Sequence, residues 1–113
     1  MPLLEPNPTL SIFQDYVKKL ELERGFNHQT VKDKCIMLGE EVGELFKAIR
    51  KKEGLEVDPN SSFSDIGEEI TDIFIFLCSI ANRYYINIVD AFRSKEEKNH
   101  KRQWVSHPEK TEQ

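Results

Sequence analysis

Two short stretches of the sequence repeat one pattern of acidic residues. Residues 38–46 read Leu-Gly-Glu-Glu-Val-Gly-Glu-Leu-Phe, and residues 66–74 read Ile-Gly-Glu-Glu-Ile-Thr-Asp-Ile-Phe. Each stretch has two adjacent glutamates and a third acid three residues after the second glutamate. Carboxylate oxygens are the ligands that hard divalent cations such as Mg²⁺ prefer in proteins. The repeated pattern therefore predicts a metal site.

Helical geometry places both acid pairs beside the apolar side of their helices. On a helix, Glu44 projects from the same side as Glu41, one turn along, and Glu69 and Asp72 are related in the same way. If the two helices pack antiparallel, the four carboxylates converge, and they repel each other unless cations are bound. We therefore predict that these four residues are catalytic and hold Mg²⁺, with Mn²⁺ able to replace it.

The first glutamate of each stretch lies farther from the apolar side. Glu40 and Glu68 either assist the metal ligands or are ordinary solvated side chains, and the sequence leaves this open. We keep Glu40 as a candidate catalytic residue.

Four helices are predicted to position these acids. Apolar spacing, capping residues and closing glycines predict helices over residues 9–24, 30–52, 64–84 and 87–102. The second helix has a regular apolar stripe that we expect to be buried: Val31, Cys35, Leu38, Val42, Leu45 and Ile49. No stretch has the alternating pattern of a strand.

The sequence therefore predicts a single all-α domain over residues 1–113. We expect it to be structured over about residues 9–102, with a mobile tail over residues 103–113. Four helices of this length enclose a thin core, and the third helix has a broad apolar surface. We therefore expect the protomers to associate.

Composition narrows the classes of partner. The net charge of −4 and the pI of about 5.4 argue against binding to nucleic acid polymers or anionic membranes. No apolar run approaches the ~20 residues of a membrane span. The first residues lack the basic and apolar regions of a secretory signal, so we expect a cytoplasmic protein. An acidic protein that handles polyanions would need metal ions to bridge the like charges.

The acid pattern resembles that of the MazG-like all-α nucleoside triphosphate pyrophosphatases, which include the dCTP pyrophosphatases. The family pattern E-x-x-E and E-x-x-D is matched by Glu41-Val-Gly-Glu44 and Glu69-Ile-Thr-Asp72. The family's Lys-x-x-x-Asn-x-x-Arg element on the last helix is similar to three downstream residues: Lys95, Asn99 and Arg102. The resemblance covers about residues 10–104. It implies a four-helix MazG-like bundle that assembles as a homodimer, or as a homotetramer built from two dimers.

The resemblance also implies an activity. Family members hydrolyse a (d)NTP between its α- and β-phosphates and release the monophosphate and pyrophosphate. The four motif acids would then be Mg²⁺ ligands, and Lys95, Asn99 and Arg102 would contact phosphate or sugar. Metal would neutralise the triphosphate and lower the pKa of a bound water that attacks in line.

The residues that contact the base are less well defined. Family members that favour cytosine nucleotides usually have aromatic residues around the base, often tryptophans, and the single tryptophan here is Trp104. The remaining candidates lie elsewhere in the chain: Phe13, Phe26, His28 and Phe76. Lys34 shares a helical column with Glu41, so it either holds a phosphate or forms a salt bridge. The preferred base and sugar stay open.

Two other interpretations remain. A carboxylate-bridged di-iron bundle uses Glu-x-x-His pairs, but no histidine follows a motif glutamate at that spacing. A non-enzymatic helical module would pair with partners through its apolar stripes, and Mg²⁺ would neither bind to the acids nor raise the melting temperature.

Overall fold

The computed structural model describes residues 1–60 and 65–102 of the chain. It contains four α-helices: α1 (Leu10–Arg24), α2 (Val31–Lys52), α3 (Ile66–Arg83) and α4 (Ile88–Lys101). The described residues contain no strand, as the sequence predicts. The predicted tail, residues 103–113, lies outside the described residues.

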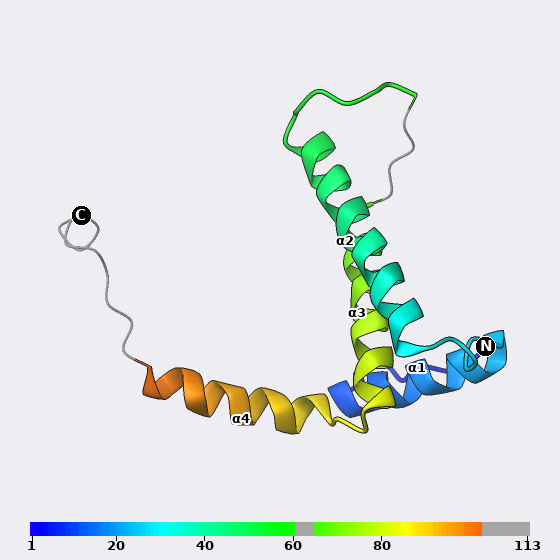
Figure 1. Ribbon diagram of the computed structural model, residues 1–113, viewed down its shortest axis with the longest axis vertical. Coiled ribbons are helices and arrows are strands. Elements are labelled where there is room, and N and C mark those ends of the chain that lie inside the picture. Colours follow the sequence, from blue (N-terminus) through cyan, green and yellow to red (C-terminus); the bar gives the residue numbers. More distant parts are fainter. Residues whose placement is uncertain (61–64, 103–113) are drawn as a thin grey trace.

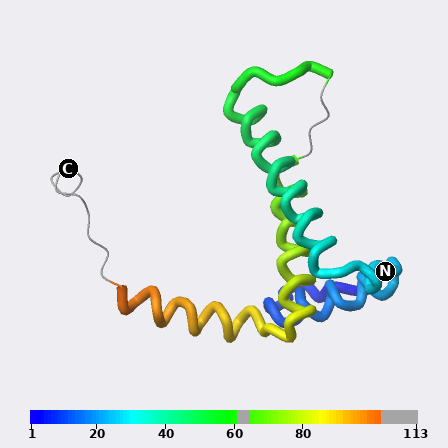
Figure 2. The backbone as a smooth tube through the Cα atoms, in the orientation of Figure 1, coloured from blue at the N-terminus to red at the C-terminus, as the bar shows by residue number. Residues whose placement is uncertain are grey.

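The helices form an antiparallel pair with a third helix across one end (Figures 1 and 2). Helices α2 and α3 lie side by side and run in opposite directions, and α1 crosses them where α2 begins and α3 ends. Helix α4 runs away from this group on the other side of α3, and α3 and α4 meet at a bend of 95°. Within one chain, the acid-bearing helices α2 and α3 are therefore neighbours, whereas α4 stands apart from both.

Local signals explain how α1 and α2 begin and end. The side chain of Thr9 accepts a hydrogen bond from the Ile12 N–H, and Thr30 and Asp33 form a reciprocal capping box at the start of α2. Gly25 closes α1 at a φ of 73°, a left-handed conformation that glycine adopts without strain. This turn directs the short connection between α1 and α2 back along the end of the helix pair.

Helix α3 begins later than predicted. The sequence suggested a start near Ser64, which lies outside the described residues, but the N-cap is Asp65 and the helix begins at Ile66. The Asp65 side chain accepts a hydrogen bond from the Glu68 N–H at 3.3 Å. An aspartate caps an N-terminus at least as well as a serine. The start is therefore moved without any change in which side of α3 faces α2.

The core lies where α1 crosses α3. Val17 and Leu20 of α1 and Cys78 of α3 are buried together. Phe13 and Phe74 pack edge to face against this group, with ring centroids 5.2 Å apart. Phe13 is therefore partly buried against the core.

The predicted apolar stripe of α2 is only partly covered. Cys35 was expected to be buried but is exposed, and Ile49 is 40% exposed. The most buried α2 residues are Lys34 and Ala48. Other large apolar residues on α2 and α3 are more than 45% exposed: Ile36, Phe46, Ile70 and Leu77. Each helix thus keeps an apolar side that the described residues leave open.

A buried glutamine fixes the direction of α4. Gln14 donates hydrogen bonds to the Asn82 side chain at 3.1 Å and to the Ile86 carbonyl at 2.7 Å, and it accepts one from the Ile88 N–H at 2.9 Å. Asn82 in turn donates to the Gln14 carbonyl at 2.9 Å. These bonds join α1, α3 and the first turn of α4.

None of the helices in the described part of the chain could cross a membrane by itself. Only α3 and α4 taken together across their bend meet the length and hydropathy of such a span.

Candidate functional site

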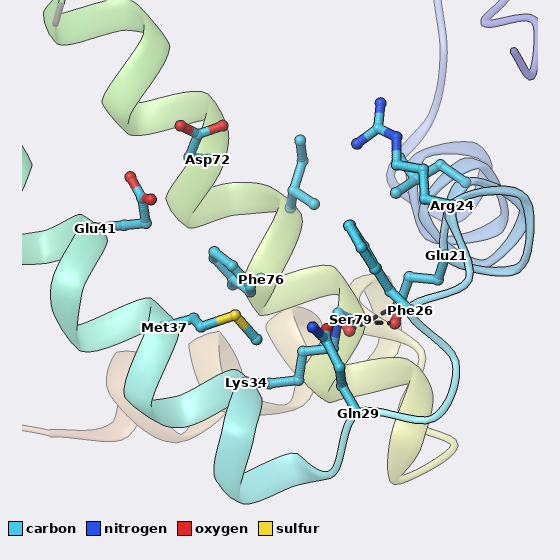
Figure 3. Close-up of a pocket in the computed structure, with 12 residues that line it drawn as sticks. Glu21, Arg24, Phe26, Gln29, Lys34, Met37, Glu41, Asp72, Phe76 and Ser79 are labelled. Carbon is cyan, nitrogen blue, oxygen red and sulfur yellow. Dashed lines mark hydrogen bonds and ion pairs between the residues drawn. The ribbon is translucent and has the colours of Figure 1, made fainter.

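Three of the predicted acids lie together between α2 and α3. Carboxylate oxygens of Glu41, Glu69 and Asp72 are all within 4.8 Å of one another. Figure 3 shows Glu41 and Asp72 on facing turns of the two helices. Glu69 is only 3% exposed, and its Oε2 atom has no hydrogen-bond partner among the described residues. A buried carboxylate oxygen without a donor is costly unless a cation occupies its free side.

The crowding of these acids perturbs Glu41. A hydrogen bond with Glu69 raises the pKa of Glu41 to about 7, and burial and the charges of Asp72, Glu69 and Glu44 act in the same direction. Below about pH 7 the metal-free cluster therefore holds a proton that a cation would displace. The all-oxygen donors, their convergence and the unpartnered Glu69 oxygen all suit a hard divalent ion.

The other acids of the repeated stretches lie outside this cluster. Glu44, the fourth predicted ligand, is exposed, although its charge contributes to the raised pKa of Glu41. Glu40 and Glu68 are also exposed. The structure therefore brings three predicted ligands together and leaves Glu44 beside them.

A cavity of about 240 Å³ extends from the acid cluster toward the α1–α2 connection. Glu41 and Asp72 lie at one end, and Gln29, Lys34 and Ser79 lie at the other (Figure 3). Between the two ends the walls are mainly apolar or aromatic: Leu20, Phe26, Met37, Ile75 and Phe76. The cavity therefore joins an anionic end to a polar inner end through an apolar middle.

A buried ion pair forms the inner end. The Lys34 Nζ atom lies 3.0 Å from Glu21 Oε2, and both side chains are more than 90% buried. Arg83 approaches the same oxygen at 3.3 Å, Ser79 donates to Glu21 Oε1 at 2.7 Å, and Lys34 donates to Gln29 Oε1 at 2.7 Å. Burial alone would raise the pKa of Glu21, but the Ser79 bond and the two cations outweigh it, so this pKa lies below its usual value.

Lys34 also lies close to two aromatic rings of the cavity. Its ammonium is 5.7 Å from the centre of the Phe26 ring and 5.8 Å from that of Phe76, within the range of cation–π attraction. Of the two roles left open for Lys34, the structure contains the salt bridge, and its partner is Glu21. Phe76, a predicted contact of the base, lines the cavity.

Several predicted substrate contacts lie elsewhere in this chain. His28 is exposed, does not line the cavity, and has its Nδ1 atom 2.7 Å from the Gly25 carbonyl oxygen. Lys95 and Asn99 lie on α4, and Arg102 is its C-cap residue. Helix α4 runs away from the pair formed by α2 and α3 (Figure 1). Asn99 donates to Glu96 on the same helix at 2.7 Å. Trp104 lies outside the described residues.

Sequence reasoning named Lys34 but missed its partner Glu21 and the neighbouring Gln29 at the inner end of the cavity. Glu21 follows Val17 by one helical turn, and Lys34 precedes Leu38 by one turn, so each charge interrupts an apolar side. Two opposite charges in apolar positions are a signal for a buried ion pair. Nothing in the sequence around Gln29 indicates that it lines the cavity, because its side chain is positioned by a hydrogen bond from Lys34.

The fold and this site describe an all-α protein in which paired carboxylates face a cavity. Residues 26–106 match the sequence model of the MazG nucleotide pyrophosphohydrolase domain, so the chain belongs to the MazG family. The crystal structure of iMazG from Vibrio DAT 722 is similar, with a TM-score of 0.62 and 26% sequence identity. That match covers 82% of this chain and 99% of the other. No curated protein matches the chain in a sequence comparison. The predicted family and the predicted all-α four-helix MazG-like fold are confirmed.

Proposed function

We propose that the protein is a Mg²⁺-dependent hydrolase that converts a (d)NTP into the (d)NMP and pyrophosphate. Membership of the MazG nucleotide pyrophosphohydrolase family supports this class of reaction. The observation that carries the proposal is the cluster of Glu41, Glu69 and Asp72, with its unpartnered buried oxygen, at the end of an aromatic-walled cavity. A nucleotide has the matching parts, a polyanion at one end and a flat base at the other.

Different residues bind the metal and the base in this proposal. Glu41, Glu69 and Asp72 hold Mg²⁺, and a rotation of the exposed Glu44 side chain adds a fourth carboxylate. Bound Mg²⁺, or Mn²⁺ in its place, neutralises phosphate charge and lowers the pKa of a bound water. The apolar middle of the cavity holds the base and thereby fixes which phosphate lies at the acids. Glu40 remains a candidate for orienting the water from outside the cluster.

We also propose that the enzyme works as a homodimer or homotetramer. Helices α2 and α3 keep apolar sides that the described part of the chain does not cover. Assembly would cover them and allow α4 of one copy to approach the acids of another, supplying Lys95, Asn99 and Arg102 to the phosphates. A cytoplasmic location, where free nucleoside triphosphates occur, fits this reaction.

Subunit mixing tests the shared site. Asp72→Asn and Lys95→Ala are each expected to be inactive alone. When the two variants are mixed and reassembled, partial activity should return. Some sites then combine the unaltered acids of one copy with the unaltered α4 of the other. Light scattering of the unaltered protein gives the number of copies. A monomer, or mixtures that stay inactive although the copies exchange, would contradict a site built across subunits.

Pyrophosphate release from a panel of dNTPs and NTPs with Mg²⁺ tests the activity itself. Altering even an outer neighbour of a metal ligand commonly costs 10–100-fold, so Glu41→Gln and Asp72→Asn should lower kcat/KM by about 100-fold or more. The control is Glu53→Gln, which removes the same charge from the exposed end of α2 and should leave activity unchanged. The proposal fails if no nucleotide is hydrolysed, or if both site variants stay fully active.

A further inference from the structure

The lining of the cavity includes two cations in very different surroundings. Among the described residues that line it, the two cations are Arg24 and Lys34. Lys34 is 3% exposed, and its charge is paired with Glu21 at 3.0 Å. Arg24, in contrast, is exposed. An anion that enters the cavity from solvent would therefore meet the guanidinium of Arg24 before the buried ammonium of Lys34.

The closing turn of α1 fixes where Arg24 lies. The Gly25 N–H donates to the Leu22 carbonyl at 3.3 Å, and the Phe26 N–H donates to the Glu21 carbonyl at 2.8 Å. These two bonds are the pair found in a Schellman motif, which ends a helix at a defined residue. Arg24 is therefore the last residue of α1, and Phe26 follows it in the wall of the cavity.

The guanidinium of Arg24 lies toward the anionic end of the cavity. Figure 3 shows it on the α1 side, across the cavity from Glu41 and Asp72 and directed away from Glu21. The outer end thus has carboxylates on one wall and a guanidinium on the other. Mg²⁺ held by carboxylates binds phosphate oxygens from one side, and a guanidinium can bind them from the other with two parallel N–H groups.

The size of the cavity places the phosphates of a nucleotide at this outer end. Pockets for drug-sized ligands are typically ~300–1,000 Å³, and this cavity, at about 240 Å³, is smaller. With a base beside Phe26 and Phe76, the phosphate chain would extend past the acids toward solvent. A triphosphate carries more negative charge than one Mg²⁺ neutralises. A second cation at the opening would therefore stabilise the phosphates that the metal does not hold.

We infer that Arg24 is a substrate-binding residue, which contacts the β- and γ-phosphates and thereby selects nucleoside triphosphates over monophosphates. The inference rests on the proposed function and assigns the recognition of the outer phosphates to the end of α1. The acids and their metal hold the α-phosphate, which every nucleotide has. A monophosphate lacks the two outer phosphates and would gain nothing from Arg24.

Calorimetry in the presence of Mg²⁺ measures this contact without hydrolysis. The probes are analogues of dUTP and dATP with an imido group between the α- and β-phosphates, and dUMP and dAMP are the comparison. Arg24→Gln should weaken binding of the triphosphate analogues about tenfold or more, because charge-assisted hydrogen bonds are the strong ones, and should change binding of the monophosphates by less than about twofold. The kcat/KM for triphosphates should fall by a similar factor.

Two further variants separate phosphate binding from a structural role. Arg24→Lys keeps the favourable cation at the C-terminal end of α1 but loses the paired N–H groups, so it should restore only part of the affinity. Full restoration by Arg24→Lys would contradict paired binding of phosphate. The matched control is Lys19→Gln, which removes the same charge from an exposed position of α1 outside this cavity. It should leave binding of both kinds of nucleotide unchanged.

The outcomes distinguish this inference from the proposed function. If triphosphates are hydrolysed and Arg24→Gln keeps the kcat/KM of the unaltered protein, the inference is wrong and the proposed function stands. If no triphosphate is hydrolysed, but the analogues bind more tightly than the monophosphates and lose that preference in Arg24→Gln, the proposed function is wrong and the phosphate site stands. An equal loss of affinity for both kinds of nucleotide, or no binding of the analogues, overturns the inference.

Discussion

Replacing Lys34 by methionine tests the buried ion pair on which the inner end of the cavity depends. Methionine has nearly the same length, so the variant removes the charge and keeps most of the packing. The ammonium would lose its contact with Glu21 at 3.0 Å, its hydrogen bond to Gln29 at 2.7 Å and its position between two aromatic rings. The fold stays possible because Arg83 remains beside Glu21.

The size of the effect follows from these contacts. Breaking a buried ion pair by removing one partner costs about 3–5 kcal/mol when the remaining charge is left uncompensated. Here Glu21 keeps Arg83 and Ser79, while the charge-assisted bond to Gln29 is also lost. We therefore expect the free energy of unfolding to fall by about 2–3 kcal/mol. That is a large part of the ~5–15 kcal/mol of a typical domain.

Urea unfolding at pH 7 measures this loss, and Lys32→Met on the exposed side of α2 is the control. The control should change stability by less than about 0.5 kcal/mol. Ionised Glu21 adds stability above its usual pKa of 4.5, and this contribution disappears as the pH falls through its lower value in the folded protein. The difference between Lys34→Met and the unaltered protein should therefore shrink below pH 4.5. A variant as stable as the unaltered protein at pH 7 would refute the assigned ion pair.

Three further outcomes are expected. Glu69→Gln should raise the melting temperature of the metal-free protein, because it relieves charge crowding, and it should abolish the rise in melting temperature that Mg²⁺ causes. The control Glu68→Gln should keep the rise caused by Mg²⁺, and a rise that survives in Glu69→Gln would place the metal elsewhere. Since the pKa of Glu41 is raised to about 7, the stability of the metal-free protein should fall and its affinity for Mg²⁺ should increase as the pH rises through 7. Calorimetry of Mg²⁺ binding in buffers of different ionisation enthalpy should detect proton release, and pH-independent binding would contradict this. Gln14→Leu should cost about 2–3 kcal/mol in urea unfolding, because it leaves the Asn82, Ile86 and Ile88 groups without partners, and a neutral effect would mean that these bonds do not fix α4.

The four helices could be predicted because their signals are local. Helical spacing of apolar residues, the Thr30–Asp33 capping box and the turn at Gly25 all act within a few residues. Short-range geometry places both acid pairs beside the apolar sides of their helices, and antiparallel packing of α2 and α3 then brings Glu41 to Glu69 and Asp72. The family could be recognised from the same residues.

What the sequence did not reveal depends on contacts between distant residues. The stripe of α2 predicted which side is apolar, but it could not tell which positions the chain's own helices cover, so Cys35 was placed in the core and Lys34 was not. The direction of α4 is set by Gln14 and by the left-handed turn at Tyr85, where φ is 56°, rather than by the pattern of α4 itself. Gln29 is held by contacts with Lys34 and Arg83, which lie on other elements.

The distance between Lys34 and Glu41 along α2 bears on which phosphate of a bound nucleotide faces the acid cluster. Lys34 and Glu41 are seven residues apart, and at ~1.5 Å per residue their backbones are separated by about 10 Å along the helix. A base held in the apolar middle of the cavity, beside Phe26 and Phe76, would place its sugar along Met37 and its first phosphate near Glu41 and Asp72. The length of the nucleoside would then determine which phosphorus faces the acids. On this argument, weakening the hold on the base should lower turnover even when the acid cluster is intact, because the α-phosphate would no longer be held in place.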